Sequence, residues 1–179
     1  MEMRQSFMEN KRIFILIFII LVLSKIGGNK AMQVENNNEK VYIYLVNSSV
    51  KSSVLNTIKL SDIPLEKSFF ISSDDVEEYN SENHTFLLTD QAYAKVFELN
   101  VPVEGRPFVV TVNDKRIYLG CFWTDFSSIP YDGIVIIKPK LKGKDILKIQ
   151  LGYPNKKFFK KQDHRNNNEV LEILKDKQK

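Results

Sequence analysis

Eleven consecutive apolar residues behind a positively charged start limit what the rest of this chain can be. Residues 1–12 are polar and include Arg4, Lys11 and Arg12, and residues 13–23 read IFILIFIILVL. A cationic start, a short apolar stretch and small residues behind it are typical of a signal peptide. A helix that spans a bilayer usually needs about 20 apolar residues, so this run is short for a membrane span.

Three interpretations of this segment stay open. Residues 1–28 form a cleaved signal peptide or an uncleaved signal anchor, or the apolar run is instead a buried helix of the domain. In the first two cases the chain from residue 29 onward faces away from the cytoplasm, so we expect an extracytoplasmic protein that is secreted or anchored to the membrane. Residues 29–40 are polar and rich in asparagine, which predicts a flexible tether.

The remainder has the length of one small domain. We expect it at residues 41–152, followed by a basic tail at 153–179 that contains a short helix. From residue 138 onward the chain carries 13 Lys or Arg and 5 Asp or Glu, so its positive charge gathers at the C-terminal end. Cys121 is the only cysteine and lies in an apolar run, which predicts a buried thiol and excludes an intrachain disulfide.

The apolar pattern predicts six or seven strands and two or three helices in mixed order. Thr89 and Asp90 form the clearest helix cap, and Asn113 with Asp114 suits a tight hairpin turn. This order predicts the α+β class, with a mixed or antiparallel sheet and helices packed on one face. Strands are expected at 41–46, 54–60, 85–88, 108–112, 116–119, 134–137 and 145–151, and helices at 74–79, 90–99 and 169–177.

The residues that could carry chemistry form no familiar catalytic or metal-binding set. His84 and His164 have no second histidine at helical ligand spacing, and the acids at 74–78 lack the alternating pattern of a calcium loop. No phosphate loop and no serine-hydrolase motif occurs. We therefore expect no metal and no cofactor, and the sequence favours a protein that is not an enzyme, with an atypical hydrolase using Ser127 or Ser128 as the enzymatic alternative.

Two segments are candidates for binding. The loop at 123–131 combines aromatic and hydroxyl side chains, and Trp and Tyr are common anchors of interfaces. The tail interleaves cations with Phe158 and Phe159, which suits an anionic membrane surface, and export argues against nucleic acid as a partner. The loop candidates are Trp123, Phe126, Ser127, Ser128 and Tyr131, and the anionic-surface candidates are Lys156, Lys157, Lys160, Lys161 and Arg165.

Residues 69–137 contain FFISSDDVEEYN, LLTDQAYAKVFEL, VPVEGRPFVVTVNDKRIYLG and FSSIPYDGIVI in that order. This succession of strand, helix, glycine, strand, turn, strand, loop and strand resembles the periplasmic head domain of SecD-type translocation proteins. The chain departs from that family because it has no multi-helix membrane part and no transmembrane proton-relay acids. The resemblance therefore implies an exported α+β binding domain, and it does not imply translocase activity.

Taken together, the sequence predicts an exported or membrane-tethered, non-enzymatic binding or accessory module of the cell envelope. Its expected partner is a protein or another envelope component, with an anionic membrane surface as a further possibility. Two alternatives stay open. One is an inhibitor or an anionic-surface-binding protein that acts through its basic tail, and the other is the atypical hydrolase.

Overall fold

A hairpin in the middle of the chain organises the sheet in the computed structural model, which describes residues 39–179 except 51, 142, 144 and 145. Its strands are β5 (Arg106–Val112) and β6 (Lys115–Trp123). The chain reverses at Asn113, whose φ of 49° is one that asparagine tolerates better than most residues. The predicted hairpin is confirmed, and both strands extend beyond the predicted residues.

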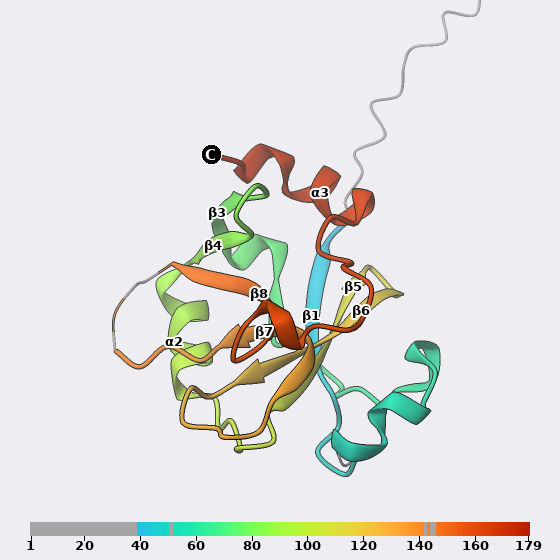
Figure 1. The fold of residues 1–179 in the computed structure, drawn as a ribbon. Helices are drawn as coiled ribbons and strands as arrows, with labels where there is room; N and C mark the ends of the chain where they lie inside the picture. The colour runs from blue at the N-terminus through green and yellow to red at the C-terminus, as the bar shows by residue number, and fades with distance from the viewer. Residues whose placement is uncertain (1–38, 51, 142, 144–145) are drawn as a thin grey trace, which may run out of the picture. The chain divides into compact units, whose positions relative to one another are not determined.

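Within the described residues, eight strands form one curled, mixed sheet in the order β2-β1-β5-β6-β7-β8-β4-β3. Neighbouring strands pair antiparallel except β6 and β7, which are parallel. The edge strands β2 and β3 are consecutive in the chain and are linked only by a 3-10 turn, η3 (Ser73–Asp75), so the sheet must curl back on itself (Figure 1). The other strands are β1 (Val41–Leu45), β2 (Ile71–Ser72), β3 (Val76–Asn80), β4 (Thr85–Leu88), β7 (Tyr131–Ile137) and β8 (Leu147–Tyr153).

Two α-helices are described, α2 (Asp90–Glu98) and α3 (Asn168–Leu174). The Thr89 side chain accepts a hydrogen bond from the Ala92 amide at 3.3 Å, so the predicted cap of α2 is confirmed. The helices lie apart in Figure 1 and form no clear layer over one face. The prediction of a small α+β domain with a mixed sheet is confirmed. The 3-10 helices are η1 (Ser52–Thr57), η2 (Leu60–Asp62), η3, η4 (Lys156–Phe158) and η5 (Lys175–Lys177).

The two faces of the sheet are packed differently. Side chains alternate between faces along a strand, so Phe108 and Val110 lie on one face and Val109 on the other. The first, which we call the inner face, belongs to a cluster of 21 buried residues that also takes in buried side chains of α2 and α3. The outer face carries two smaller clusters of four and three buried residues, one around Val109 and η1 and one around Trp123.

Other segments of the chain bond to the outer sides of β1 and β3. Along β1, the Phe70 amide donates to the Ile43 carbonyl at 2.7 Å, and the Glu66 amide donates to the Leu45 carbonyl at 2.9 Å. Along β3, the C-terminal Lys179 amide donates to the Tyr79 carbonyl at 3.2 Å. Residues 153–179, which the sequence separates as a tail, thus lie in the same compact unit, Glu39–Lys179.

Two predicted elements are wrong. Residues 54–60 were expected as a strand, but they fall in and after the 3-10 helix η1, where Leu55 packs against Val109 on the outer face. Residues 74–79 were expected as a helix, but the capping signal that suggested it closes only the single turn η3. The β-branched Val76 then starts strand β3, which pairs with β4.

The helix expected at 169–177 is present as α3 and η5. The predictions for residues 1–28, and for all but the last two residues of the tether at 29–40, lie outside the described residues. Among the described residues, no helix is both long enough and apolar enough to cross a bilayer.

Candidate functional site

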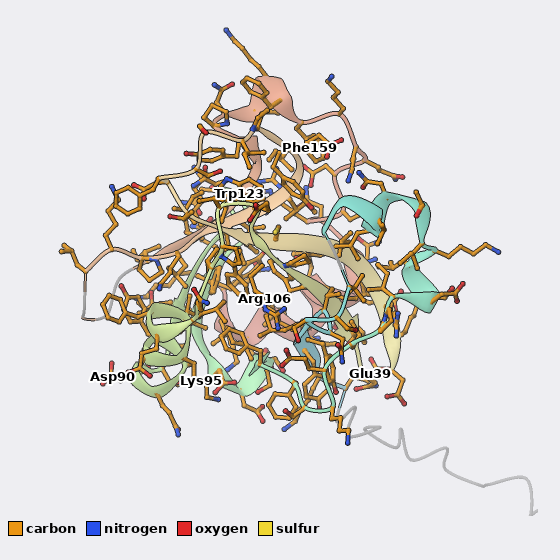
Figure 2. All side chains as sticks on the ribbon, turned by 90° about the horizontal axis from the view of Figure 1, so that it is seen from below. Glu39, Asp90, Lys95, Arg106, Trp123 and Phe159 are labelled. Carbon is orange, nitrogen blue, oxygen red and sulfur yellow. The ribbon has the colours of Figure 1, made fainter. Side chains whose placement is uncertain are left out.

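A groove of about 1110 Å³ lies at the end of the sheet where β1 and β6 end and β5 and β7 begin, and its lining includes Leu45 of the inner cluster and Trp123 of an outer cluster. One wall carries Ser48, Val50 and Asn56 from the connection after β1. The opposite wall is formed by residues 129–132, and the loop before β5 supplies the floor around Gly105. Arg106 and Trp123, which both line the groove, lie near the middle of Figure 2.

The floor is held by a stack of aromatic rings. The ring of Trp123 is 5.0 Å from that of Tyr131 and nearly parallel to it, and 5.8 Å from that of Tyr153. Gly105, with φ of 82°, lies against the same indole, and a Cβ there would come within 2.4 Å of the ring. Only glycine combines this φ with such a close approach. The lack of a side chain at Gly105 therefore allows the loop to approach the indole closely.

Trp123 is only 2% exposed, and its indole Nε1 has no hydrogen-bond partner among the described residues. A buried donor without an acceptor is costly and uncommon in native proteins. The Nε1 atom is itself buried and is not exposed in the groove.

The rim of the groove carries charges of both signs. The Arg106 guanidinium forms an ion pair with Glu66. The Lys161 ammonium donates to the Asn56 side-chain oxygen at 2.9 Å, lies 3.3 Å from the Asp132 carboxylate and sits 5.6 Å from the centre of the Tyr131 ring. These contacts join the two walls at one end and leave no strong net charge for a ligand of either sign.

Hydrogen bonds within the loop and to neighbouring segments hold the loop at 124–130 in place. The Ser127 hydroxyl donates to the Val103 carbonyl at 2.7 Å and accepts from the Ile129 amide at 3.1 Å. The Tyr153 hydroxyl bonds the carbonyl oxygens of Asp125 at 3.1 Å and Ser127 at 3.0 Å. The buried Ser127 hydroxyl is therefore engaged by main-chain atoms and holds the loop in place.

The loop residues that the sequence predicted as binding residues have different environments in the structure. Trp123 and Tyr131 line the groove, and burial raises the pKa of the Tyr131 phenol. Phe126 is 83% exposed and Ser128 is also exposed, but neither lines the groove. Ser127 has the structural role just described.

The five cations that were predicted to bind an anionic surface also have different environments. Lys156 and Lys157 are exposed on η4, Lys160 lines the groove, and Lys161 bonds Asn56 and Asp132. Arg165 is mostly buried. Its guanidinium bonds the Asp163 carboxylate at 2.7 and 2.9 Å and the Ile149 carbonyl at 2.9 Å, and the hydrogen bond from Arg165 holds the pKa of Asp163 below its usual range.

His84 and Cys121 are both buried. The His84 Nδ1 has no partner among the described residues, and burial lowers the pKa of the imidazole. Burial likewise raises the pKa of the Cys121 thiol far above its ordinary value, so the thiol is a poor nucleophile. No group of three or more His, Cys, Asp or Glu in the described part of the chain could hold a metal ion.

Sequence reasoning missed most of the groove. Ser48 and Asn56, from the connection after β1, belong to no distinctive motif, and Lys160 was expected to bind an anionic surface and not to line a groove, so only the tertiary fold brings these residues together. Gly105 was the one available signal, because a glycine between two prolines indicates a loop with unusual backbone angles. No model of a known protein family matches this chain, and no curated protein and no solved structure matches it either.

Proposed function

We propose that this protein is a non-enzymatic binding module of the cell envelope, exported or held at the membrane by its N-terminal segment. Its groove at the end of the sheet would hold an extended peptide segment of a partner protein. The observation that carries the proposal is the groove itself. Its volume of about 1110 Å³ slightly exceeds that of most small-molecule sites, which enclose roughly 300–1,000 Å³. The cellular address rests on the apolar N-terminal run and on the resemblance to SecD-type head domains.

The lining of the groove suits a peptide. Val50, Pro102 and Ile129 offer apolar contact, and the side-chain amides of Asn56 and Asn100 can both donate and accept. An extended peptide presents a main-chain donor and acceptor at nearly every residue, so it can use such mixed walls along its whole length.

Strand addition at a sheet edge is a less suitable mode. The outer side of β1 is already bonded to the segment that contains Glu66 and Phe70, and β3 is bonded to the C-terminal residue. A partner peptide that joined the sheet would have to displace one of these segments. The groove needs no such displacement.

The test is selection of peptides from a random displayed library on the full-length protein, followed by affinity measurement by fluorescence anisotropy. Ser48→Trp places a large ring at the groove wall and should weaken binding of selected peptides about tenfold or more, since the groove is then filled. Ser128→Trp is the matched control, because Ser128 is exposed but does not line the groove. Equal affinities for Ser48→Trp and the wild type would refute the groove as the site.

The geometry gives less support to the two alternatives, an anionic-surface-binding protein and an atypical hydrolase. An anionic surface bound through the tail would rely on Lys156, Lys157 and Lys160, since Lys161 and Arg165 already have carboxylate partners. For the hydrolase, the Ser127 hydroxyl donates to a carbonyl and not to a histidine. Labelling of the protein by a serine-directed activity probe would revive that alternative.

A further inference from the structure

Exposed apolar side chains gather on one part of the surface. Eight large apolar side chains are exposed among the described residues, and five of them lie on three loops, at 99–105, 124–130 and 138–146. Phe126 and Leu141 are the most exposed of all, at 83% and 78%. The five residues on these loops are Val103, Phe126, Ile129, Leu141 and Ile146.

The three loops are connected to one another and to the domain. The Ser127 hydroxyl bonds the Val103 carbonyl at 2.7 Å, which ties the second loop to the first. Lys140 forms an ion pair with Asp125, and its ammonium lies 5.5 Å from the centre of the Phe126 ring. The Tyr93 hydroxyl of α2 donates to the Leu141 carbonyl at 3.2 Å. Phe126 and Leu141 are therefore displayed by loops that the fold holds in place.

We propose that a loop patch of Val103, Phe126 and Leu141, with Lys138 and Lys140 beside it, inserts into the interface of a bilayer that has anionic headgroups. None of the three apolar side chains lines the groove, and each is at least half exposed. Apolar side chains flanked by lysines are the combination that binds proteins to anionic membrane interfaces.

Charge favours this occupant over a protein. The Lys140 ammonium lies over the Phe126 ring, 5.5 Å from its centre, so contact of that ring with a bilayer would bring the cation close to the lipid headgroups. Its ion pair with Asp125 is largely exposed on the lysine side, at 62%, and such pairs are weak enough to exchange for a phosphate. A bilayer also requires no pocket of matching shape for the two separate apolar tips.

This contact is separate from the groove, because Phe126 and Leu141 lie outside the groove lining. The loop patch can therefore be tested independently of peptide binding.

The experiment places a polarity-sensitive fluorophore on single introduced cysteines of the full-length protein. Cys121 is 1% exposed with a raised thiol pKa, so it should stay unlabelled beside an exposed cysteine, and the labelled wild type checks this. The variants are Phe126→Cys and Leu141→Cys, with Phe69→Cys and Phe158→Cys as controls that are also exposed, at 45% and 39%. Each is reconstituted with vesicles of phosphatidylglycerol and phosphatidylcholine, or of phosphatidylcholine alone.

We expect blue-shifted emission at positions 126 and 141 with anionic vesicles, and quenching there by lipids that carry a quencher in the acyl chain. The probe at 69 should keep its emission in water. Lys138→Glu with Lys140→Glu should lower the apparent vesicle affinity measured at position 126 by about tenfold, since two attractive charges become repulsive.

Three results would overturn the proposal. Probes at 126 and 141 could keep the emission of the probe at 69 with every vesicle. The probe at 158 alone could be quenched, which would assign membrane contact to the tail. The emission of the probes at 126 and 141 could stay unchanged with every vesicle and shift only when envelope proteins are added without vesicles. That result would make the loop patch a protein-docking surface.

Discussion

The inner and outer faces of the curled sheet differ in how completely they are covered. The inner face belongs to one cluster of 21 buried residues, to which both α-helices contribute. The outer face has clusters of only four and three buried residues, and the groove opens at the end of the sheet where the clusters meet the loops. The continuous inner cluster supplies most of the hydrophobic stabilisation, so the end of the sheet can leave a large hollow open. Stability and binding should therefore respond to different substitutions.

The largest effect is expected from removing residues 168–179. Val170 and Leu174 of α3 are each 6% exposed in the inner cluster, and the same segment covers the edge of β3. Their loss opens the core and frees a strand edge, so we expect a loss of roughly 4 kcal/mol or more, or no cooperative unfolding at all. Urea unfolding followed by circular dichroism measures this.

The double variant Glu172→Ser with Lys175→Ser is the control for that truncation, because it removes only an exposed ion pair of the same segment. It should unfold close to the wild type. A truncated chain as stable as this control would mean that the inner face does not need α3.

Phe122→Ala should destabilise the inner face next most strongly. Its ring is fully buried and lies 4.9 Å from the ring of Phe108 and 5.7 Å from that of Phe70. Truncation of a buried Phe leaves a cavity and costs about 3–5 kcal/mol. Peptide affinity under native conditions should stay within about twofold, since Phe122 does not line the groove. A large loss of affinity in the folded variant would show that the two faces are coupled.

Gly105→Ala should have a smaller effect on stability but should change the groove. The new Cβ would meet the Trp123 ring and the Cys121 sulfur, at 2.4 and 2.5 Å, in addition to the strain at a φ of 82°. We expect a loss of about 1–3 kcal/mol in thermal unfolding, together with weaker peptide binding.

Gly143→Ala provides the comparison for Gly105→Ala. Gly143 has a φ of 128°, and a Cβ there would meet nothing within 4 Å. The difference between the two variants therefore isolates the contact with the outer aromatic stack from the cost of the backbone angle. If both lost the same stability, the close approach of Gly105 to Trp123 would have no energetic weight.

The smallest expected effect is a pH dependence at the β3–β4 turn. Burial, and next the Arg165 cation, lower the pKa of His84. As pH falls below the ordinary imidazole value of about 6.5, the unfolded chain therefore takes up a proton that the folded chain resists, and stability decreases. The depressed pKa of Asp163 acts only below its usual acidic range, so a comparison of pH 7.5 with pH 5 isolates the histidine.

His84→Asn should reduce this decrease, because asparagine tolerates the φ of 55° and does not titrate. The urea midpoints of both proteins at the two pH values give the measurement. An equal decrease in both proteins would assign the pH dependence to another group.

Local signals in the sequence sufficed for the hairpin of β5 and β6 and for α2. Asn113 and the Thr89 cap act within a few residues of their own positions, so a sequence pattern can contain the whole cause. The helix expected at 74–79 failed because the pairing of Val76 with β4 ends the helical turn after Asp75.

Longer-range features had no such signal. Parallel strands usually need a crossover of a dozen or more residues, whereas β6 and β7 are joined by a loop of seven residues at 124–130. Trp123 was expected at a contact surface but is 2% exposed, because Gly105 in the loop before β5 and Tyr131 at the start of β7 cover its ring. The walls of the groove likewise come from connections that only the tertiary fold brings side by side, such as the connection after β1 and residues 129–132.

The three-residue turn between β2 and β3 has a consequence for how the sheet is kept closed. Because Ser73–Asp75 joins one border strand directly to the other, neither border can move away while the chain is intact. A circularly permuted protein opened at residue 74 would lose this restraint. Its sheet could flatten, and the freed borders would be available to pair with a second molecule.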